Sequence, residues 1–171
     1  NELLQLNNKR IVELGCGRAD VTRDIAENGS NRQLIAFEVD EQQHALNLTI
    51  SDLPNVKFEL GAAQAIPVAA ASQDIVFMFK SLHHVPNDKL DSAMQEIHRV
   101  LSDEGMAYIS EPVFAGDFND IVRLFHDEKQ VRIDAFNAVK KSLASGLFEL
   151  LDEVFFNMPV SFDNFEDFEN K

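Results

Sequence analysis

Short apolar runs alternate along the chain with segments in which apolar residues recur every three or four positions. The runs have the length of strands and occupy residues 10–14, 33–39, 56–60, 74–79 and 106–110. The run at 74–79 is unbroken, which is typical of a strand buried on both faces. This alternation indicates repeated β-α units, so we expect an α/β fold with a doubly wound, mostly parallel sheet and helices on both faces.

Capping and terminating residues predict where the intervening helices begin and end. Gly29 is placed to end the first helix. Asp40, followed three positions later by Gln43, forms the pattern of a capping box at the start of the second. We expect Gly105 to end the third, whose apolar face is formed by Leu90, Met94, Ile97 and Leu101.

The pattern changes after Pro112, beyond the last expected strand of the core. Residues 113–146 are predicted to form a helical insertion after the fifth strand, because apolar residues recur there at helical spacing over a longer stretch than one crossover needs. These apolar residues are Ile121, Leu124, Phe125, Val131, Ala135, Val139 and Leu143.

The last segment, residues 147–171, is acidic and rich in phenylalanine. We expect residues 148–157 to form a sixth strand and residues 163–169 a short helix or loose terminus. The simplest interpretation is an amphipathic segment docked on the domain, and a surface for a basic partner is the alternative. We therefore expect residues 1–171 to form one domain with a core at 9–112. The sequence leaves open whether the C-terminal end of this domain is truncated.

Composition narrows the class of partner. A chain of 171 residues can bury a single core without covalent staples. Fifteen Lys and Arg against 29 Asp and Glu give a formal charge of −14, so we expect no nucleic acid partner.

Cys16 is the single cysteine, which favours the cytoplasm and excludes an internal disulfide. No run is long enough to span a membrane. The chain starts at Asn1 without a leader and has the character of a domain from a longer protein.

The candidate chemistry begins where the first strand ends. Gly15 and Gly17 lie in the loop between that strand and the next helix, where backbone must approach a ligand closely. Glu38 ends the second strand about twenty residues later, the position of a carboxylate that accepts hydrogen bonds from ribose hydroxyls. Asp20 stands where a dinucleotide fingerprint requires glycine, which disfavours a nicotinamide cofactor. A cofactor with an amine and no phosphate, such as S-adenosylmethionine, tolerates Glu13 beside the loop.

These motifs resemble class I S-adenosylmethionine-dependent methyltransferases, especially the small-molecule type of quinone-biosynthesis C-methyltransferases. The resemblance covers residues 9–112 and implies a Rossmann-like fold with S-adenosylmethionine as cofactor. It implies that the cofactor lies against Glu13, Gly15, Gly17, Glu38, Ala62, Ala63 and Lys80. The matching stretches are residues 13–19, 36–40, 61–67, 74–77, 81–85, 99–101 and 105–112.

Two positions depart from the family pattern. Ala19 replaces its usual third glycine, which costs little if the local φ is negative. Ala62 replaces an acid that hydrogen-bonds the adenine amino group, and the loss of one such bond weakens cofactor binding roughly tenfold. Gln64 or the amide of Ala63 are the possible substitutes, and the sequence does not choose between them.

The candidate catalytic residues follow the fourth and fifth strands. His83 or His84 is positioned to take a proton from a small or medium-sized acceptor, and Glu111 borders the same site. The alternative is that one histidine packs and the other is solvated. We expect no metal site. The predicted function is methyl transfer to this acceptor, and the second hypothesis is a methyltransferase-like binding or regulatory module without turnover. The acceptor and the oligomeric state stay open.

Overall fold

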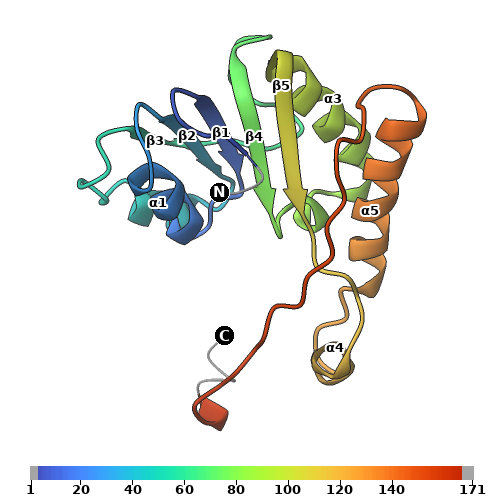
Figure 1. Ribbon diagram of the computed structural model, residues 1–171. Helices are drawn as coiled ribbons and strands as arrows, with labels where there is room; N and C mark the ends of the chain where they lie inside the picture. The colour runs from blue at the N-terminus through green and yellow to red at the C-terminus, as the bar shows by residue number, and fades with distance from the viewer. Residues whose placement is uncertain (1–3, 167–171) are drawn as a thin grey trace.

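The computed structural model describes residues 4–166 and contains one parallel β-sheet. Its strand order is β3-β2-β1-β4-β5, and every neighbouring pair is parallel. The α/β fold with a parallel sheet is thereby confirmed (Figure 1). The strands are β1 (Arg10–Leu14), β2 (Gln33–Glu38), β3 (Val56–Leu60), β4 (Gln73–Phe79) and β5 (Leu101–Ser110).

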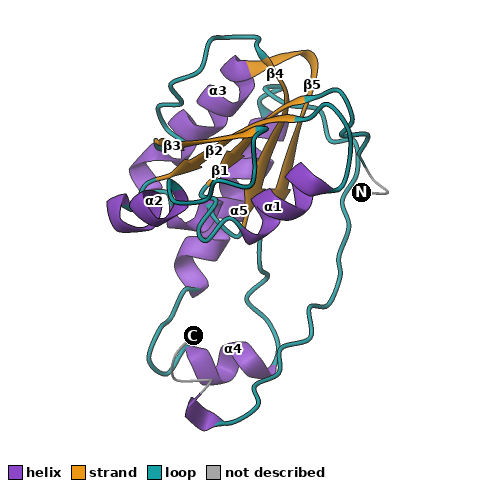
Figure 2. Ribbon diagram, turned by 90° about the vertical axis from the view of Figure 1, so that its left-hand side faces the viewer, coloured by secondary structure: helices purple, strands orange, loops and turns teal. Residues whose placement is uncertain are grey.

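Helices cover both faces of this sheet. Helix α1 lies against one face, and α3 and α5 pack side by side on the other (Figures 1 and 2). The helices are α1 (Asp20–Glu27), α2 (Glu41–Asn47), α3 (Leu90–Val100), α4 (Asp117–Val122) and α5 (Lys129–Ala144). A short 3₁₀ turn, η1 (Leu82–His84), follows β4, and a second, η2 (Asn87–Lys89), leads into α3. Within residues 4–166, no helix is long and apolar enough to span a bilayer.

The core consists of two layers because successive strand residues point to opposite faces. Val12 of β1 belongs to the layer between the sheet and the α3–α5 pair. Its neighbour Ile11 belongs to the layer beneath α1. Both side chains are fully buried. The central strands therefore need apolar residues at consecutive positions, as the unbroken pattern predicts.

The position of β1 between β2 and β4 places the candidate site. Ile11 pairs with Leu34 of β2 on one side and with Ile75 of β4 on the other. Helix α1, which follows β1, lies on one face of the sheet. Helix α3, which follows β4, lies on the opposite face. In such open sheets a crevice for ligands forms at the carboxyl ends of the strands where the order reverses.

The expected end of the third helix is wrong. Helix α3 ends at Val100, and β5 begins at once with Leu101, which has extended dihedral angles. Gly105 therefore lies inside β5. A register shift accommodates it, since Gln73 pairs with Leu101 while Ile75 pairs with Met106. A Cβ on Gly105 would lie 2.9 Å from the carbonyl oxygen of Ser102, so close backbone approach explains the glycine.

The expected sixth strand is also wrong. Residues 148–157 form no strand, and Phe155 and Phe156 are both largely exposed. Adjacent phenylalanines lack the alternation of a half-buried strand, and the nearby carboxylates of Asp152 and Glu153 would lose hydration in a sheet. Among the described residues 147–166, Leu147 and Phe148 pack on the core and Phe162 contacts α4, so the segment docks in part rather than along its length. A helix begins at residues 165–166, and the rest of the predicted 163–169 helix or loose terminus lies outside the described residues.

Candidate functional site

The loop after β1 is built around residues with left-handed backbone. Gly15 has φ +75° and Gly17 has φ +52°. A Cβ on Gly15 would lie 2.6 Å from the Cβ of Ser81, so this glycine lets β1 and the end of β4 approach each other. A Cβ on Gly17 would meet nothing within 4 Å. Gly17 therefore faces open space, which fits a loop that leaves room for a ligand.

Ala19 also has left-handed backbone, with φ +64° and ψ +23°, immediately before α1. The expectation that alanine costs little here required a negative φ, and φ is positive instead. The Ala19 amide donates to the carbonyl oxygen of Cys16 at 2.9 Å, and this turn inside the loop imposes the conformation. The position requires left-handed backbone, which glycine adopts freely and alanine adopts only with strain. This explains why the family usually has glycine there.

Glu38 points toward the glycine loop from the end of β2. Its Oε2 accepts a hydrogen bond from the Gly17 amide at 2.8 Å. Its Oε1 accepts from the amides of Val39 at 2.8 Å and Asp40 at 3.0 Å. An ionised carboxylate has about four acceptor positions, so these three bonds leave one for a hydroxyl of a ligand. The sequence located this carboxylate, and the structure brings it to the loop.

Glu13 is buried beneath the same loop. It accepts a hydrogen bond of 2.6 Å from the hydroxyl of Thr22 on α1. Burial raises the pKa of Glu13 to about 7, and the Thr22 hydrogen bond opposes the rise in part. A cationic ligand nearby would favour the ionised form.

Asn47 holds the loop from its outer side, a role that the sequence did not reveal. Its side-chain amide donates to the Gly17 carbonyl oxygen at 2.8 Å and lies 3.4 Å from the Cys16 sulfur. Burial, together with the charges of Glu13 and Glu38, raises the pKa of the Cys16 thiol to about 12. Cys16 is therefore a packing residue, as expected. The one signal for Asn47 is its place in α2, one turn after Gln43.

Ala62 and Ala63 lie directly after β3, in a tight turn closed by a bridge between Ala62 and Ala65. The Gly61 amide donates to the Glu38 carbonyl oxygen at 3.0 Å, which fixes this turn beside the end of β2. Ala63 is buried. The turn thus lies next to the glycine loop, where the resemblance expects the adenine.

Lys80 directly follows β4 and has left-handed backbone, φ +53°. Its amide donates to the Ser110 carbonyl oxygen at 2.8 Å, and the residue is exposed. The backbone of Lys80 thus closes the end of the β4–β5 pair.

The candidate catalytic residues meet beyond the ends of β4 and β5. Glu111 accepts hydrogen bonds from the Leu82 amide at 2.8 Å and from Nδ1 of His83 at 2.5 Å. His83 is buried, and the ring of the exposed His84 lies 4.1 Å from its ring centre. Partial burial, and then the neighbouring His83, lower the pKa of His84. The hydrogen bond to Glu111 leaves Nε2 of His83 available for a ligand.

Glu128, immediately before α5, approaches the same histidines and was not identified from the sequence. Its Oε1 lies 4.0 Å from Nε2 of His83 and 3.0 Å from Nε2 of His126, and its Oε2 accepts from Arg132 at 2.5 Å. Burial opposes ionisation, but the Arg132 hydrogen bond and charge prevail and lower the pKa of Glu128. No local sequence pattern identifies this residue, because Glu128 lies some forty positions after His83 and reaches it only when α5 packs beside β4 and β5.

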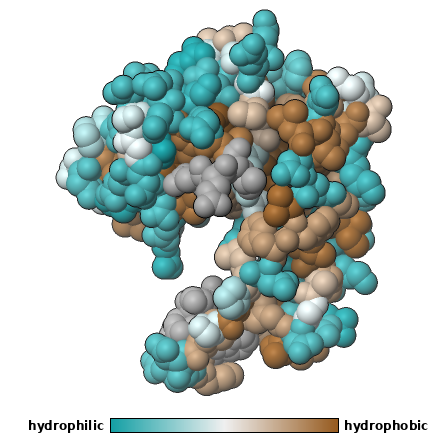
Figure 3. All heavy atoms as spheres, in the orientation of Figure 1, coloured by the Kyte–Doolittle hydropathy of each residue, from teal (hydrophilic) through white to brown (hydrophobic). Residues whose placement is uncertain are grey.

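A hollow separates the body of the molecule from a lower lobe (Figure 3). This lobe contains α4, which lies beyond the carboxyl ends of β4 and β5 in Figure 1. Phe118 of α4 stacks on Phe162 of the C-terminal segment, with ring centres 6.1 Å apart. The segments after Pro112 thus face the end of the sheet that carries the candidate residues.

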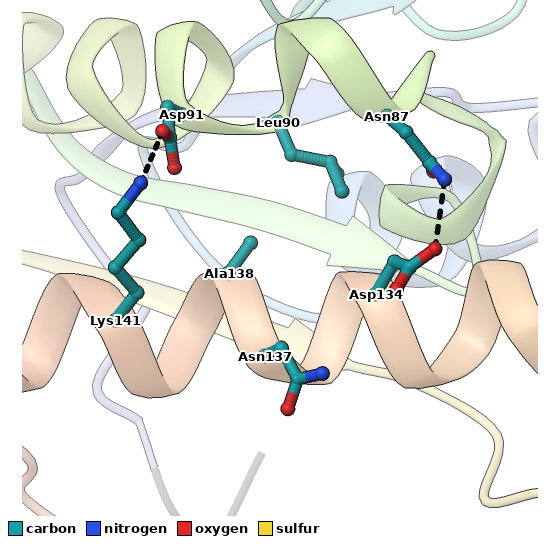
Figure 4. A pocket seen from close by; sticks show the side chains of 7 residues that line it. All are labelled: Asn87, Leu90, Asp91, Asp134, Asn137, Ala138 and Lys141. Atoms are coloured by element: carbon teal, nitrogen blue, oxygen red, sulfur yellow. Dashed lines mark hydrogen bonds and ion pairs between the residues drawn. The ribbon is translucent and has the colours of Figure 1, made fainter.

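Two cavities lie away from the glycine loop. One, of about 360 Å³, lies between α3 and α5, where Lys141 pairs with Asp91 and Asn87 donates to Asp134 (Figure 4). Polar side chains that line this cavity pair with one another between α5 and the η2–α3 segment, so the cavity is part of the interface between these helices. The other, of about 220 Å³, lies on the α1 side of the sheet beside Phe77. Neither cavity is lined by a candidate cofactor-binding or catalytic residue.

The chain matches a family described as a methyltransferase domain over residues 11–105. An uncharacterized methyltransferase-like protein of Schizosaccharomyces pombe is 35% identical over 95 residues, which are 56% of this chain and 35% of that protein. The chain thus spans about a third of the length of this relative.

Solved structures show the same fold. YcgJ of Bacillus subtilis matches with a TM-score of 0.60 and 18% identity, over 66% of this chain and 48% of that chain. The [4+2]-cyclase SpnF matches with a TM-score of 0.55 and 23% identity, over 66% of this chain and 42% of that chain. The family match covers more than half of the chain, including the glycine loop and Glu38. The chain therefore belongs to the methyltransferase domain family, and it has the fold of solved S-adenosylmethionine-dependent methyltransferases.

Proposed function

We propose that the protein binds S-adenosylmethionine and transfers its methyl group to a small or medium-sized acceptor. The observation that carries this proposal is the Glu38 carboxylate, bonded to the Gly17 amide at 2.8 Å beside a loop whose glycine faces open space. The membership of the methyltransferase domain family supports it. The single, unreactive Cys16 supports action in the cytoplasm, and the charge of −14 supports an acceptor other than nucleic acid.

The cofactor is proposed to lie across the ends of β1, β2 and β3. Gly15 and Gly17 let the backbone approach its methionine part, and the buried Glu13 favours its ammonium. Glu38 uses its remaining acceptor position for a ribose hydroxyl. Ala63 lies along the adenine, and neighbouring Ala62 supplies no hydrogen bond to it.

Methyl transfer itself requires mainly alignment. A lone pair of the acceptor forms the new bond to the methyl carbon as the carbon–sulfur bond breaks, and the sulfur leaves as a neutral thioether. Holding donor and acceptor in line can contribute about 7 to 11 kcal/mol. The lobe containing α4, with α5, is proposed to select the acceptor, because it faces the ends of β4 and β5.

His83 is proposed to take the proton that the acceptor loses. Glu111 holds Nδ1 of His83 at 2.5 Å, which orients the ring so that Nε2 receives the proton. A ring carbon made nucleophilic by loss of a neighbouring hydroxyl proton fits such a base. This acceptor agrees with the resemblance to quinone-biosynthesis C-methyltransferases.

The second candidate is a methyltransferase-like binding module without turnover. Ala62 favours it, because an alanine there removes a hydrogen bond to the cofactor. The fold alone does not decide, since the [4+2]-cyclase SpnF shares it. Cofactor binding without product across a broad panel of phenols, amines and carboxylic acids would favour the module.

Calorimetric titration with S-adenosylmethionine tests the cofactor site. We expect binding by the unmodified protein and a loss of affinity of about ten- to a hundredfold in Glu38→Ala, which removes a charged acceptor. The matched control is Glu41→Ala, which removes an exposed carboxylate three positions away and should leave the affinity unchanged. Equal affinity of Glu38→Ala and the unmodified protein would remove the ribose assignment, and no binding by the unmodified protein would remove the function.

A further inference from the structure

Two histidines and a carboxylate converge beyond the ends of β4 and β5. The ligand atoms offered by His83, His84 and Glu128 all lie within 4.8 Å of one another. They come from two parts of the chain, η1 after β4 and the start of α5. The fold therefore builds this cluster, which differs from a chance group of exposed acids on one loop.

A fourth residue orients the buried member of the cluster. Glu111 fixes Nδ1 of His83 at 2.5 Å and is itself held by the Leu82 amide at 2.8 Å. Nε2 of His83 then faces Oε1 of Glu128 at 4.0 Å. A carboxylate behind a histidine, with the other ring nitrogen turned to a common centre, is the arrangement that orients histidine ligands in metal sites.

The distances suit a small divalent cation. Zinc binds histidine nitrogen and carboxylate oxygen at about 2.0 to 2.2 Å, so two of its ligands lie roughly 3.3 to 3.6 Å apart in a tetrahedral site and at most about 4.3 Å apart in any geometry. The His83–Glu128 distance of 4.0 Å is within this limit. The ligand atoms of all three residues lie within 4.8 Å of one another, so cation binding requires His84 and Glu128 to move closer to a common centre.

We propose that His83, His84 and Glu128 bind a divalent transition-metal cation of the zinc type. Two imidazoles and one carboxylate form a ligand set typical of zinc sites that keep an open position. Imidazole ligands favour zinc, nickel and copper over magnesium, which prefers oxygen ligands and retains its waters. This site goes beyond the proposed methyl transfer and does not require the cofactor.

Neighbouring groups already hold the carboxylate in place. Arg132 binds Oε2 of Glu128, which leaves Oε1 for the cation. His126 shares Oε1 at 3.0 Å, so the cation either displaces this exposed ring or takes it as a further ligand. With the cation bound, Nε2 of His83 is a ligand and no longer takes the proton, and the cation instead lowers the pKa of an acceptor hydroxyl that occupies its open position.

Metal binding by the full chain, without cofactor, tests the site. Equilibrium dialysis against zinc chloride should give one bound zinc per chain, and excess magnesium chloride should not displace it. Cobalt chloride should give visible absorption bands from a site of low coordination number. Both His84→Ala and Glu128→Gln should weaken zinc binding by at least about tenfold, because each removes one ligand or its charge.

His98→Ala and Glu149→Gln are the matched controls, because they remove an exposed histidine and an exposed carboxylate elsewhere and should leave zinc affinity unchanged. Equal zinc affinity in all four variants would overturn the proposal, as would displacement by magnesium. Absence of stoichiometric zinc binding would overturn it while leaving cofactor binding, measured separately, untouched.

Discussion

Two carboxylates at the site differ in what surrounds them. Glu38 accepts three backbone hydrogen bonds, whereas buried Glu13 accepts one from Thr22. The three amides supply Glu38 with hydrogen-bond donors, whereas burial raises the pKa of Glu13 to about 7. At neutral pH, Glu13 is therefore close to its point of half ionisation.

The stability of the protein should depend on pH through Glu13. Its pKa is near 4.5 in the unfolded chain and about 7 in the folded one, so the folded state binds more protons between these values. The stabilisation is full below pH 4.5 and is lost as the pH rises through 7, by on the order of 3 kcal/mol. Urea unfolding of the unmodified protein and of Glu13→Gln should show their difference shrinking over this range. A difference in stability that stays constant between pH 4.5 and 7 would contradict this assignment.

At the scale of single residues, the sequence located Glu38, Gly17, His83 and Glu111 because strand ends at regular spacing place them. It did not locate Asn47 or Glu128. Each of these acts through a contact across about thirty positions or more, with Gly17 and His83 respectively. Such contacts depend on how helices pack on the sheet, and local patterns carry no signal for that.

At the scale of elements, the start of α1 depends on one strained residue. Ala19 is buried, and its left-handed backbone ends the glycine loop where the helix begins. The strand and helix pattern predicted α1 well, because amphipathic spacing is a local property. The backbone angle that joins loop to helix was not predictable, since it is set by the turn from Cys16 to Ala19.

Ala19→Val should destabilise the protein by at least about 2 kcal/mol. A branched side chain is strongly disfavoured at positive φ, and the site is too well packed for two added methyl groups. The control is Ala45→Val on the exposed side of α2, which should cost less than about 1 kcal/mol. Urea unfolding measures both losses, and equal losses in the two variants would refute the strain at Ala19.

Element boundaries show the same division between local and distant causes. The expected β1 and β3 match the structure residue for residue. The N-cap of α2 is also confirmed, since Asp40 accepts from the Gln43 amide at 2.8 Å. Gly105 was misassigned because its role, a close approach to Ser102 within a shifted strand, arises only when β5 pairs with β4.

At the scale of the whole molecule, the C-terminal segment contributes little to the core. Leu147 and Phe148 pack against it, whereas the apolar side chains that follow are largely exposed: Leu150, Leu151, Val154, Phe155 and Phe156. Composition predicted that these residues would dock, because apolar side chains usually do. The contacts observed in the described chain place the boundary of the core at Phe148.

Truncation after Phe148 should therefore leave the midpoint of thermal unfolding within about 3 °C of the full chain. Truncation after Ala144, which also removes Leu147 and Phe148, should lower it clearly, because the contact of Phe148 with His98 is lost as well. Calorimetry of both truncated chains gives the comparison. A large fall in the unfolding midpoint of the chain that ends at Phe148 would show that the exposed segment after it stabilises the fold.

The single thiol, Cys16, lies within the glycine loop between Gly15 and Gly17 and can report on that loop. Cys16 is buried, and its high pKa keeps it almost entirely protonated at neutral pH. Because the thiol is buried, we expect alkylating reagents to label it slowly, at a rate that rises when the loop around it opens. Any compound that seals the crevice will slow this chemistry, which turns one cysteine into an assay for occupancy that needs no turnover.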